Sequence, residues 1–160
     1  MSMMLLLFTL LQLVQPPAHL AIAASTSAAS AAPGSKMSLF LDITPRPGIH
    51  VYAPGAKDYL PIAVTIIPHP GVTFGPIQYP KAEVMEFEGD HVPVYQKPFR
   101  LVEAVSLGSS LKRATTLTLT GIVKYQACDD RVCFIPASVP VSWSIAIGPG
   151  PSGKARRPGA

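Results

Sequence analysis

Two cysteines, Cys128 and Cys133, are the residues of this chain whose type and spacing could do chemistry. Strand-like residues lie on both sides of the pair, and Asp129-Asp130 between them is a turn-forming dipeptide. The pattern predicts a hairpin in which the cysteines face each other across a four-residue loop. Opposed residues in such a hairpin have Cα atoms about 4.5–5.5 Å apart, which is within reach of a disulfide. The bond could then form and break without any rearrangement of distant segments.

The spacing leaves a structural disulfide and an exchangeable one both open. By loop entropy, closing a six-residue ring contributes only about 2 kcal/mol to stability, against about 4 kcal/mol for a loop of about sixty residues. A short ring between adjacent strands also tends to be strained, and strain raises the reduction potential and favours exchange. Tyr125, Phe134 and Pro136 flank the cysteines, and they are expected either to form a partly shielded pocket or to serve ordinary sheet packing.

Neither a metal site nor a cofactor site is predicted. Two cysteine sulfurs need two further ligands to hold a zinc ion. The spacing of the four histidines does not supply them: His19, His50, His69 and His91. The carboxylates at residues 83–90 are more typical of a solvated strand or loop than of a general acid and base. A hydrolase or metalloenzyme is therefore the least favoured class.

Residues 1–24 have the features of a secretory signal peptide. An apolar run at residues 5–14 precedes small residues at 21–25, which offer an A-x-A-like cleavage site. The run is too short to span a bilayer comfortably. No Lys or Arg precedes it, and an uncleaved membrane anchor is the alternative. Export predicts an oxidising compartment, in which the cysteines can be joined, and His19 would leave with the signal.

The positive charge of the chain lies outside the expected folded part. Residues 25–36, rich in Ser and Ala, are expected to be a low-complexity linker with nothing to bury, and residues 149–160 a disordered basic tail. The net charge of +4 comes from Lys36 and three cations of this tail, because residues 37–148 hold nine Lys or Arg and nine Asp or Glu. A neutral folded part lacks the clustered cations that polyphosphate binding requires, which excludes nucleic acid as a partner.

Residues 37–148 are expected to form a single all-β domain. Apolar and polar residues alternate, as from Met37 to Ile43, and turn residues interrupt the runs frequently. The 18 prolines exclude long helices. About seven strands are expected, over residues 37–44, 49–52, 62–67, 72–74, 99–107, 115–125 and 139–147. This pattern predicts an antiparallel β-sandwich of immunoglobulin-like type.

The cysteine segment, residues 123–136 (VKYQACDDRVCFIP), resembles the active-site hairpin of the N-terminal (alpha) domain of the thiol:disulfide interchange protein DsbD. That family has the same order of a Tyr-Gln pair, a small residue, two cysteines around a short loop, an aromatic residue and a proline. The loop here is one residue shorter than in the best-known members. Residues 48–55 (GIHVYAPG) resemble an early strand of the family, Tyr79-Pro80 also fits, and residues 85–89 (MEFEG) are similar to the segment that caps the cysteines. The resemblance runs from about residue 39 to residue 147.

The resemblance implies an immunoglobulin-like sandwich in the periplasm that passes reducing equivalents by thiol–disulfide exchange. Cys128 and Cys133 would be the redox pair, with Cys133 as the nucleophile towards the partner's disulfide. Phe87 would be the aromatic residue of the cap. Tyr52 and His50 would line the pocket, His50 standing where better-known members have a tyrosine.

The resemblance also implies the partners. These would be thioredoxin-like periplasmic proteins, among them disulfide isomerases and the thioredoxins of cytochrome c biogenesis. The membrane and thioredoxin-like domains of the family are not encoded after residue 149, so the electrons are expected to come from a separate membrane protein. The chain would act as a protein-disulfide reductase without a small-molecule cofactor. The alternative is a redox-inert, secreted immunoglobulin-like binding or structural module with a fixed disulfide.

Overall fold

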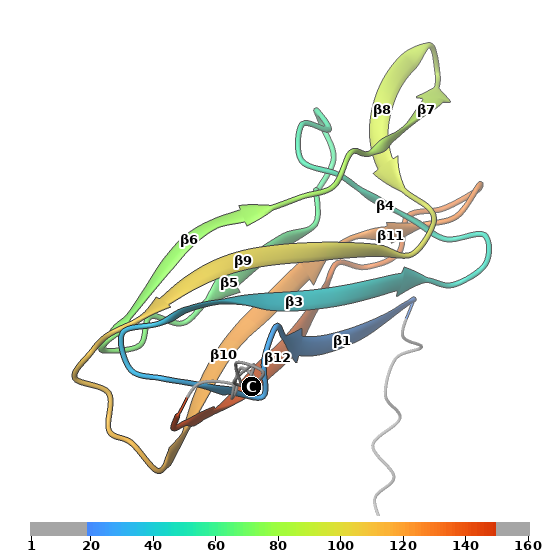
Figure 1. Ribbon diagram of the computed structural model, residues 1–160. Helices are drawn as coiled ribbons and strands as arrows, with labels where there is room; N and C mark the ends of the chain where they lie inside the picture. The colour runs from blue at the N-terminus through green and yellow to red at the C-terminus, as the bar shows by residue number, and fades with distance from the viewer. Residues whose placement is uncertain (1–18, 150–160) are drawn as a thin grey trace, which may run out of the picture.

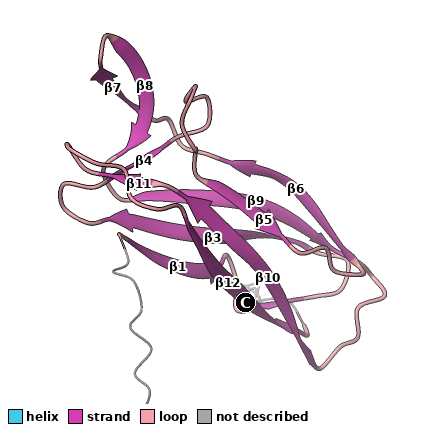
Figure 2. Ribbon diagram, turned by 180° about the vertical axis from the view of Figure 1, so that it is seen from behind, coloured by secondary structure: helices cyan, strands magenta, loops and turns pink. Residues whose placement is uncertain are grey.

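Three β-sheets make up the part of the protein that the computed structural model describes, residues 19–149. Every regular element in this range is a β-strand. Two four-stranded sheets pack face to face around the main core, and a third four-stranded sheet lies at one end of them (Figures 1 and 2). The expected all-β, immunoglobulin-like sandwich is confirmed.

The first sheet has one face in the core and one in solvent. Its order is β1-β3-β9-β6, with strands β1 (Leu20–Thr26), β3 (Lys36–Pro45), β9 (Phe99–Leu107) and β6 (Val72–Gln78). Every second side chain of β3 from Met37 to Ile43 is buried, as the period of two predicts. On the solvent face, Arg100 donates two hydrogen bonds to the Asp42 carboxylate, at 2.7 and 2.8 Å.

The second sheet closes the main core from the other side. Its order is β2-β12-β10-β5, with strands β2 (Ser30–Ala31), β12 (Ala137–Ile147), β10 (Thr115–Tyr125) and β5 (Ala63–Ile66). β10 and β12 pair along their whole length. Trp143 of β12 is buried, and its indole N–H donates to the carbonyl of Phe40 on β3 at 3.0 Å. This bond joins the two sheets across the core.

The third sheet lies at the end of the sandwich that carries the cysteines. Its order is β11-β4-β8-β7, with strands β11 (Ala127–Cys128), β4 (His50–Tyr52), β8 (Asp90–Tyr95) and β7 (Glu83–Phe87). β7 and β8 form a hairpin, called the cap hairpin here, which projects from the sandwich (Figure 1). Its turn residues Glu88 and Gly89 have φ angles of 50° and 87°, as a tight type I′ turn requires. The sequence patterns predicted neither β7 nor β8.

The N-terminal segment departs from the sequence prediction. The linker expected at residues 25–36 is wrong, because this range contains the end of β1 and all of β2. β1 pairs with β3 from Leu20↔Pro45 to Thr26↔Leu39, so residues 20–24, expected to leave with the signal peptide, belong to the sheet. Backbone pairing at a sheet edge needs no large apolar side chains, which is why Ala and Ser suffice here. The rest of the expected signal peptide, residues 1–18, and residues 150–160 of the expected tail lie outside the described residues.

A chain that begins at Ser25, as cleavage after Ala24 would produce, should be less stable than one that begins at His19. It lacks five of the seven β1–β3 pairs and the buried Leu20 side chain. Burial of one leucine alone contributes about 2 kcal/mol, so the free energy of unfolding in urea should fall by at least about that amount. Leu20→Ala in the chain that begins at His19 removes only the Leu20 side chain. It therefore separates the contribution of that side chain to stability from the contribution of the β1–β3 backbone pairs. Equal unfolding midpoints for the two chains would contradict the assignment of β1 to the fold.

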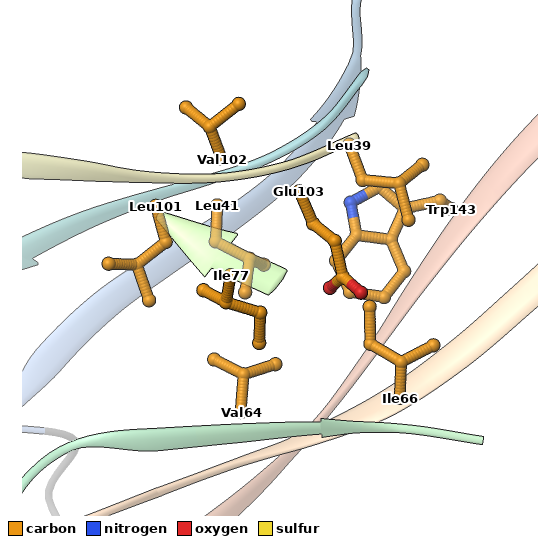
Figure 3. A pocket seen from close by; sticks show the side chains of 9 residues that line it. All are labelled: Leu39, Leu41, Val64, Ile66, Ile77, Leu101, Val102, Glu103 and Trp143. Carbon is orange, nitrogen blue, oxygen red and sulfur yellow. The ribbon is translucent and has the colours of Figure 1, made fainter. Parts of the chain in front are cut away.

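A carboxyl group lies inside the main core. Glu103 of β9 is 7% exposed and faces apolar side chains that include Leu39, Ile77 and Trp143 (Figure 3). Within the described residues its buried Oε2 atom has no hydrogen-bond partner. Burial therefore disfavours the charged form and raises the pKa of Glu103 from 4.5 to about 6.

This carboxyl group should make the domain more stable in mild acid. Because the folded pKa lies above the unfolded one, the folded state is penalised above pH 6, and the penalty disappears as the pH falls from 7 towards 4.5. The shift corresponds to about 2 kcal/mol. Glu103→Gln should be more stable than the parent at pH 7 and equally stable near pH 4.5, as measured by urea unfolding at each pH. A stability difference between Glu103→Gln and the parent that is the same at both pH values would contradict a buried charge at Glu103. The histidines are present in both proteins, so any contribution from them cancels in this difference.

Candidate functional site

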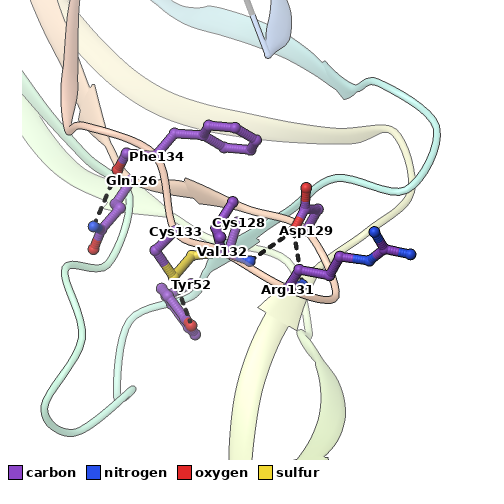
Figure 4. The surroundings of a disulfide bond; sticks show 8 residues. All are labelled: Tyr52, Gln126, Cys128, Asp129, Arg131, Val132, Cys133 and Phe134. Atoms are coloured by element: carbon purple, nitrogen blue, oxygen red, sulfur yellow. Dashed lines mark hydrogen bonds between the residues drawn. A yellow bond between two sulfur atoms is a disulfide. The ribbon is translucent and has the colours of Figure 1, made fainter.

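The cysteine turn consists of residues 128–133, and in it the cysteines face each other as the spacing predicted, with their Cα atoms closer than the expected range. Cys128 and Cys133 form a disulfide, their Cα atoms are 4.0 Å apart, and the two residues form an antiparallel bridge. The Asp129 carboxylate accepts hydrogen bonds from the backbone N–H groups of Arg131 and Val132, both at 2.8 Å (Figure 4). These two hydrogen bonds lower the pKa of Asp129, and the bond from Val132 has the larger effect. The carboxylate thus closes the loop that brings the sulfurs together.

Hydrogen bonds to neighbouring residues hold both legs of the turn, the segment that leads into Cys128 and the segment that follows Cys133. The N–H of Phe134 donates to the carbonyl of Ala127 at 2.8 Å, and the side-chain amide of Gln126 donates to the carbonyl of Phe134 at 3.2 Å (Figure 4). On its other side β11 pairs with β4, with Cys128 opposite His50. The leg with Cys128 is therefore the middle one of three hydrogen-bonded segments, and the leg with Cys133 is the outer one.

The two cysteines differ in exposure. Cys128 is 1% exposed and belongs to a small apolar cluster with Tyr52, Val92 and Val94, separate from the main core. Cys133 is exposed. The Tyr52 hydroxyl lies 3.7 Å from the Cys133 sulfur, and since a disulfide sulfur carries no hydrogen, the hydroxyl is the donor. Of the two joined residues, Cys133 is the one that solvent reaches.

A groove of about 580 Å³ separates the cysteine turn from the cap hairpin. Its walls come from the cysteine turn, from β4 and the loop before it, and from the cap hairpin and the residue after it. The lining residues are Gly48, His50, Tyr52, Met85, Phe87, Val92, Gln96 and residues 128–133. The disulfide thus faces a space open to solvent with mixed apolar and polar walls.

Three of the residues that the sequence assigned to the site meet in this groove. His50 and Tyr52 are two apart on β4, so both point to the same side of the strand. Phe87 stands at the end of β7 on the opposite wall and is 47% exposed. Their roles in exchange stay predictions.

The three expected pocket residues that flank the cysteines, Tyr125, Phe134 and Pro136, do not line the groove. Tyr125 is buried in the main core, because every second residue of β10 faces that core and Tyr125 continues the alternation. The ring of Phe134 stacks on His19, with ring centroids 4.0 Å apart, and packs against the main core. His19 therefore contacts the fold next to the cysteine turn, whereas the sequence analysis expected it to leave with the signal.

The sequence analysis missed several residues of the site. Met85 and Val92 are cross-strand partners in the cap hairpin, and Gln96 follows it. Gly89 between two runs of alternating apolar residues is a signal that could have revealed this hairpin. Tyr59, which stacks on Tyr52 at 4.2 Å between ring centroids, comes from a loop without any such pattern.

The two β4 side chains beside the disulfide, His50 and Tyr52, are neutral at neutral pH. Burial lowers the pKa of His50, although the nearby Asp129 carboxylate opposes this, so the imidazole is uncharged at pH 7. Burial and the neighbouring Tyr59 raise the pKa of Tyr52, so its hydroxyl keeps its proton. Within residues 19–149 no three His, Cys, Asp or Glu side chains come together in a way that could hold a metal ion.

The chain was compared with known protein families, curated proteins and solved structures. Residues 19–142 match the family described as thiol:disulfide interchange protein DsbD, N-terminal. The chain belongs to this family. No significant match was found among curated proteins. The start of the match at residue 19 agrees with β1 as the first strand of the domain.

Solved structures that are similar to the chain include two N-terminal domains. The N-terminal periplasmic domain of ScsB from Proteus mirabilis has a TM-score of 0.54 and 15% identity, over 81% of this chain and 48% of that one. The N-terminal domain of DsbD from Neisseria meningitidis in the reduced form has a TM-score of 0.44 and 17% identity, over 76% of this chain and 82% of that one. This chain therefore spans about half the length of the ScsB domain. In the part of the chain that the structure describes, no helix could cross a bilayer.

Proposed function

We propose that this protein is a periplasmic thiol–disulfide exchange domain that reduces a disulfide in a thioredoxin-like partner protein. The observation that carries the proposal is the difference in exposure between two joined cysteines, Cys133 exposed and Cys128 buried, beside an open groove. The rate of exchange depends on which sulfur is attacked and on access to it. This difference supports an exchange in which a second protein meets Cys133 first.

The reaction follows from the difference in exposure. In the reduced pair, the Cys133 thiolate attacks one sulfur of the partner's disulfide, and the partner's other sulfur leaves as a thiolate and takes up a proton. The Cys128 thiolate then attacks the Cys133 sulfur and releases the partner's second thiolate. Two electrons have passed to the partner, and the domain is left with the Cys128–Cys133 disulfide seen in the structure.

A donor restores the reduced pair by the reverse chemistry. Its thiolate attacks the exposed Cys133 sulfur, Cys128 leaves, and the donor's second thiolate resolves the mixed disulfide. We expect this donor to be a separate membrane protein, and the acceptors to be disulfide isomerases or the thioredoxins of cytochrome c biogenesis. Export by the N-terminal segment would bring the domain to these partners. The Tyr52 hydroxyl, already directed at the Cys133 sulfur, would donate a hydrogen bond to its thiolate.

Trapping of the mixed disulfide tests the order of attack. The probe is a thioredoxin-like protein without its second cysteine, whose remaining cysteine is activated with 5-thio-2-nitrobenzoate. The Cys128→Ser variant should form a stable adduct and release the chromophore, since its free thiol, Cys133, is exposed. Cys133→Ser is the matched control and should react at least about tenfold more slowly, because the Cys128 thiol is buried.

Three results would contradict the proposal or part of it. Equal rates for the two variants would show that the order of attack is wrong. Failure of both to react would show that the domain does not exchange with such proteins. A reduction potential of the Cys128–Cys133 couple below about −300 mV would fit the alternative, a redox-inert module with a fixed disulfide.

The role of Phe87 as a cap gives a second prediction. If its ring shields Cys133, Phe87→Ala should raise the rate at which the reduced pair reacts with a small oxidant such as glutathione disulfide, by a few-fold. Ile67→Ala is a matched control, because Ile67 is 54% exposed and does not line the groove. An unchanged rate for Phe87→Ala, or an equal rise for both variants, would contradict the cap assignment.

A further inference from the structure

Tyr52 is held in place by two other aromatic side chains. Tyr59 stacks on its ring, with centroids 4.2 Å apart and planes 22° from parallel. The edge contact with His50 has a centroid distance of 5.5 Å and an interplanar angle of 84°. The hydroxyl group lies in the plane of its own ring, so whatever fixes this ring also fixes the distance from the hydroxyl to the Cys133 sulfur. His50 already lines the groove, but Tyr59 does not.

Tyr59 reaches Tyr52 from a loop with defined anchors. The loop spans residues 53–61 and joins β4 to the bridge at Pro61. The Ala53 N–H donates to the carbonyl of Pro93 at 2.9 Å, and the Ile62 N–H donates to the carbonyl of Tyr52 at 2.8 Å. Asp58, directly before Tyr59, has a φ of 62°, a left-handed conformation that Asp tolerates better than most residues. The loop therefore has a defined shape on both sides of Tyr59.

Tyr59 faces a different space from the one that a partner would enter. It lines a separate cavity of about 450 Å³, together with Lys57, Asp58 and His91, and this cavity shares Val92 with the groove. Tyr59 also packs against the small cluster that contains Cys128, but its stack on Tyr52 is the contact that connects it to the Cys133 sulfur. The raised pKa of Tyr52, to which Tyr59 contributes, keeps the hydroxyl protonated and able to donate at neutral pH.

We propose that Tyr59 is a positioning residue of the exchange site: its stacking on Tyr52 holds the Tyr52 hydroxyl where it donates a hydrogen bond to the Cys133 thiolate of the reduced pair. This inference rests on the proposed function. It names Tyr59 as the residue that orients the hydrogen-bond donor of the Cys133 sulfur. Without the stack, the Tyr52 ring can rotate and the hydroxyl spends less time at the sulfur. A thiolate that loses a hydrogen bond becomes a stronger base, so its thiol ionises at higher pH.

The test measures the ionisation of Cys133 alone. In the Cys128→Ser background, the rate of alkylation by iodoacetamide is followed from pH 5 to 10, and its midpoint gives the pKa of Cys133. Tyr52→Phe should raise this pKa and reduce the rate at pH 7 by roughly tenfold, as expected for one hydrogen bond to a charged group. Tyr59→Ala should do the same, whereas Tyr59→Phe, which can still stack, should behave like the parent. Tyr59→Leu fills the space without stacking and should give the same pKa as Tyr59→Ala. It keeps the test valid if the smaller alanine side chain impairs folding.

A double variant distinguishes positioning from a general effect on packing. If Tyr59 acts through the hydroxyl of Tyr52, Tyr59→Ala should have no further effect on the Cys133 pKa once Tyr52 is Phe. Additive shifts, a shift caused by Tyr59→Phe, or no shift with either Tyr59→Ala or Tyr59→Leu would overturn the proposal. Iodoacetamide needs no protein partner, so this result is independent of the trapping experiment. A normal Tyr59 effect in a domain that forms no mixed disulfide would refute the proposed function and leave the positioning role intact.

Discussion

Two backbone pairs between β11 and β4 determine where the chemistry of this domain takes place. β10 ends at Tyr125 in the second sheet, and two residues later Ala127 pairs with Val51 in the third. The chain thus changes sheets at Gln126, whose side chain bonds to the carbonyl of Phe134 and ties the two legs of the turn together. This change places Cys128 opposite His50 and within the cluster that contains Tyr52. Had β10 continued straight, the cysteines would have remained at the edge of the sandwich without a groove beside them.

The domain separates the part that holds the fold from the part that reacts. The main core is built from the first two sheets and contains neither cysteine, while Cys128 belongs to the smaller cluster under the cap hairpin. A six-residue ring contributes only about 2 kcal/mol through chain entropy. The contacts of Cys128 lie in the small cluster, so we expect opening of the bond to act there and to leave the contacts among β3, β9, β10 and β12 in place.

The sequence predicted the features that depend on local pattern. The alternation along residues 37–44 and 115–125, the tight turn at Asp129-Asp130 and the facing cysteines are all found as expected. β1 escaped prediction because Leu20 and Ile22, which alternate and contact the main core, were read as part of the signal peptide, and β2 is only two residues long. Tyr125 was assigned to the wrong surface because it was grouped with the nearby Cys128, whereas the alternation of β10 places it in the main core. The stack of Tyr59 on Tyr52 depends on the path of a loop, and no spacing in the sequence encodes it.

The charges around the turn explain why a neutral hydroxyl should matter here. The sequence contains Asp129, Asp130 and Arg131 within four residues of Cys133, and their net effect on a thiolate cannot be read from the sequence. In the structure the Asp129 carboxylate accepts two backbone N–H groups, which offset its charge, and the contact between Arg131 and Asp130 spans 4.0 Å between highly exposed side chains. Exposed ion pairs of this kind are screened by water and contribute little. With His50 uncharged as well, the Tyr52 hydroxyl is the donor that the structure places at the reactive sulfur. A site that relies on one neutral dipole, and on the ring that orients it, can be adjusted by residues that do not line the groove, and Tyr59 is such a residue.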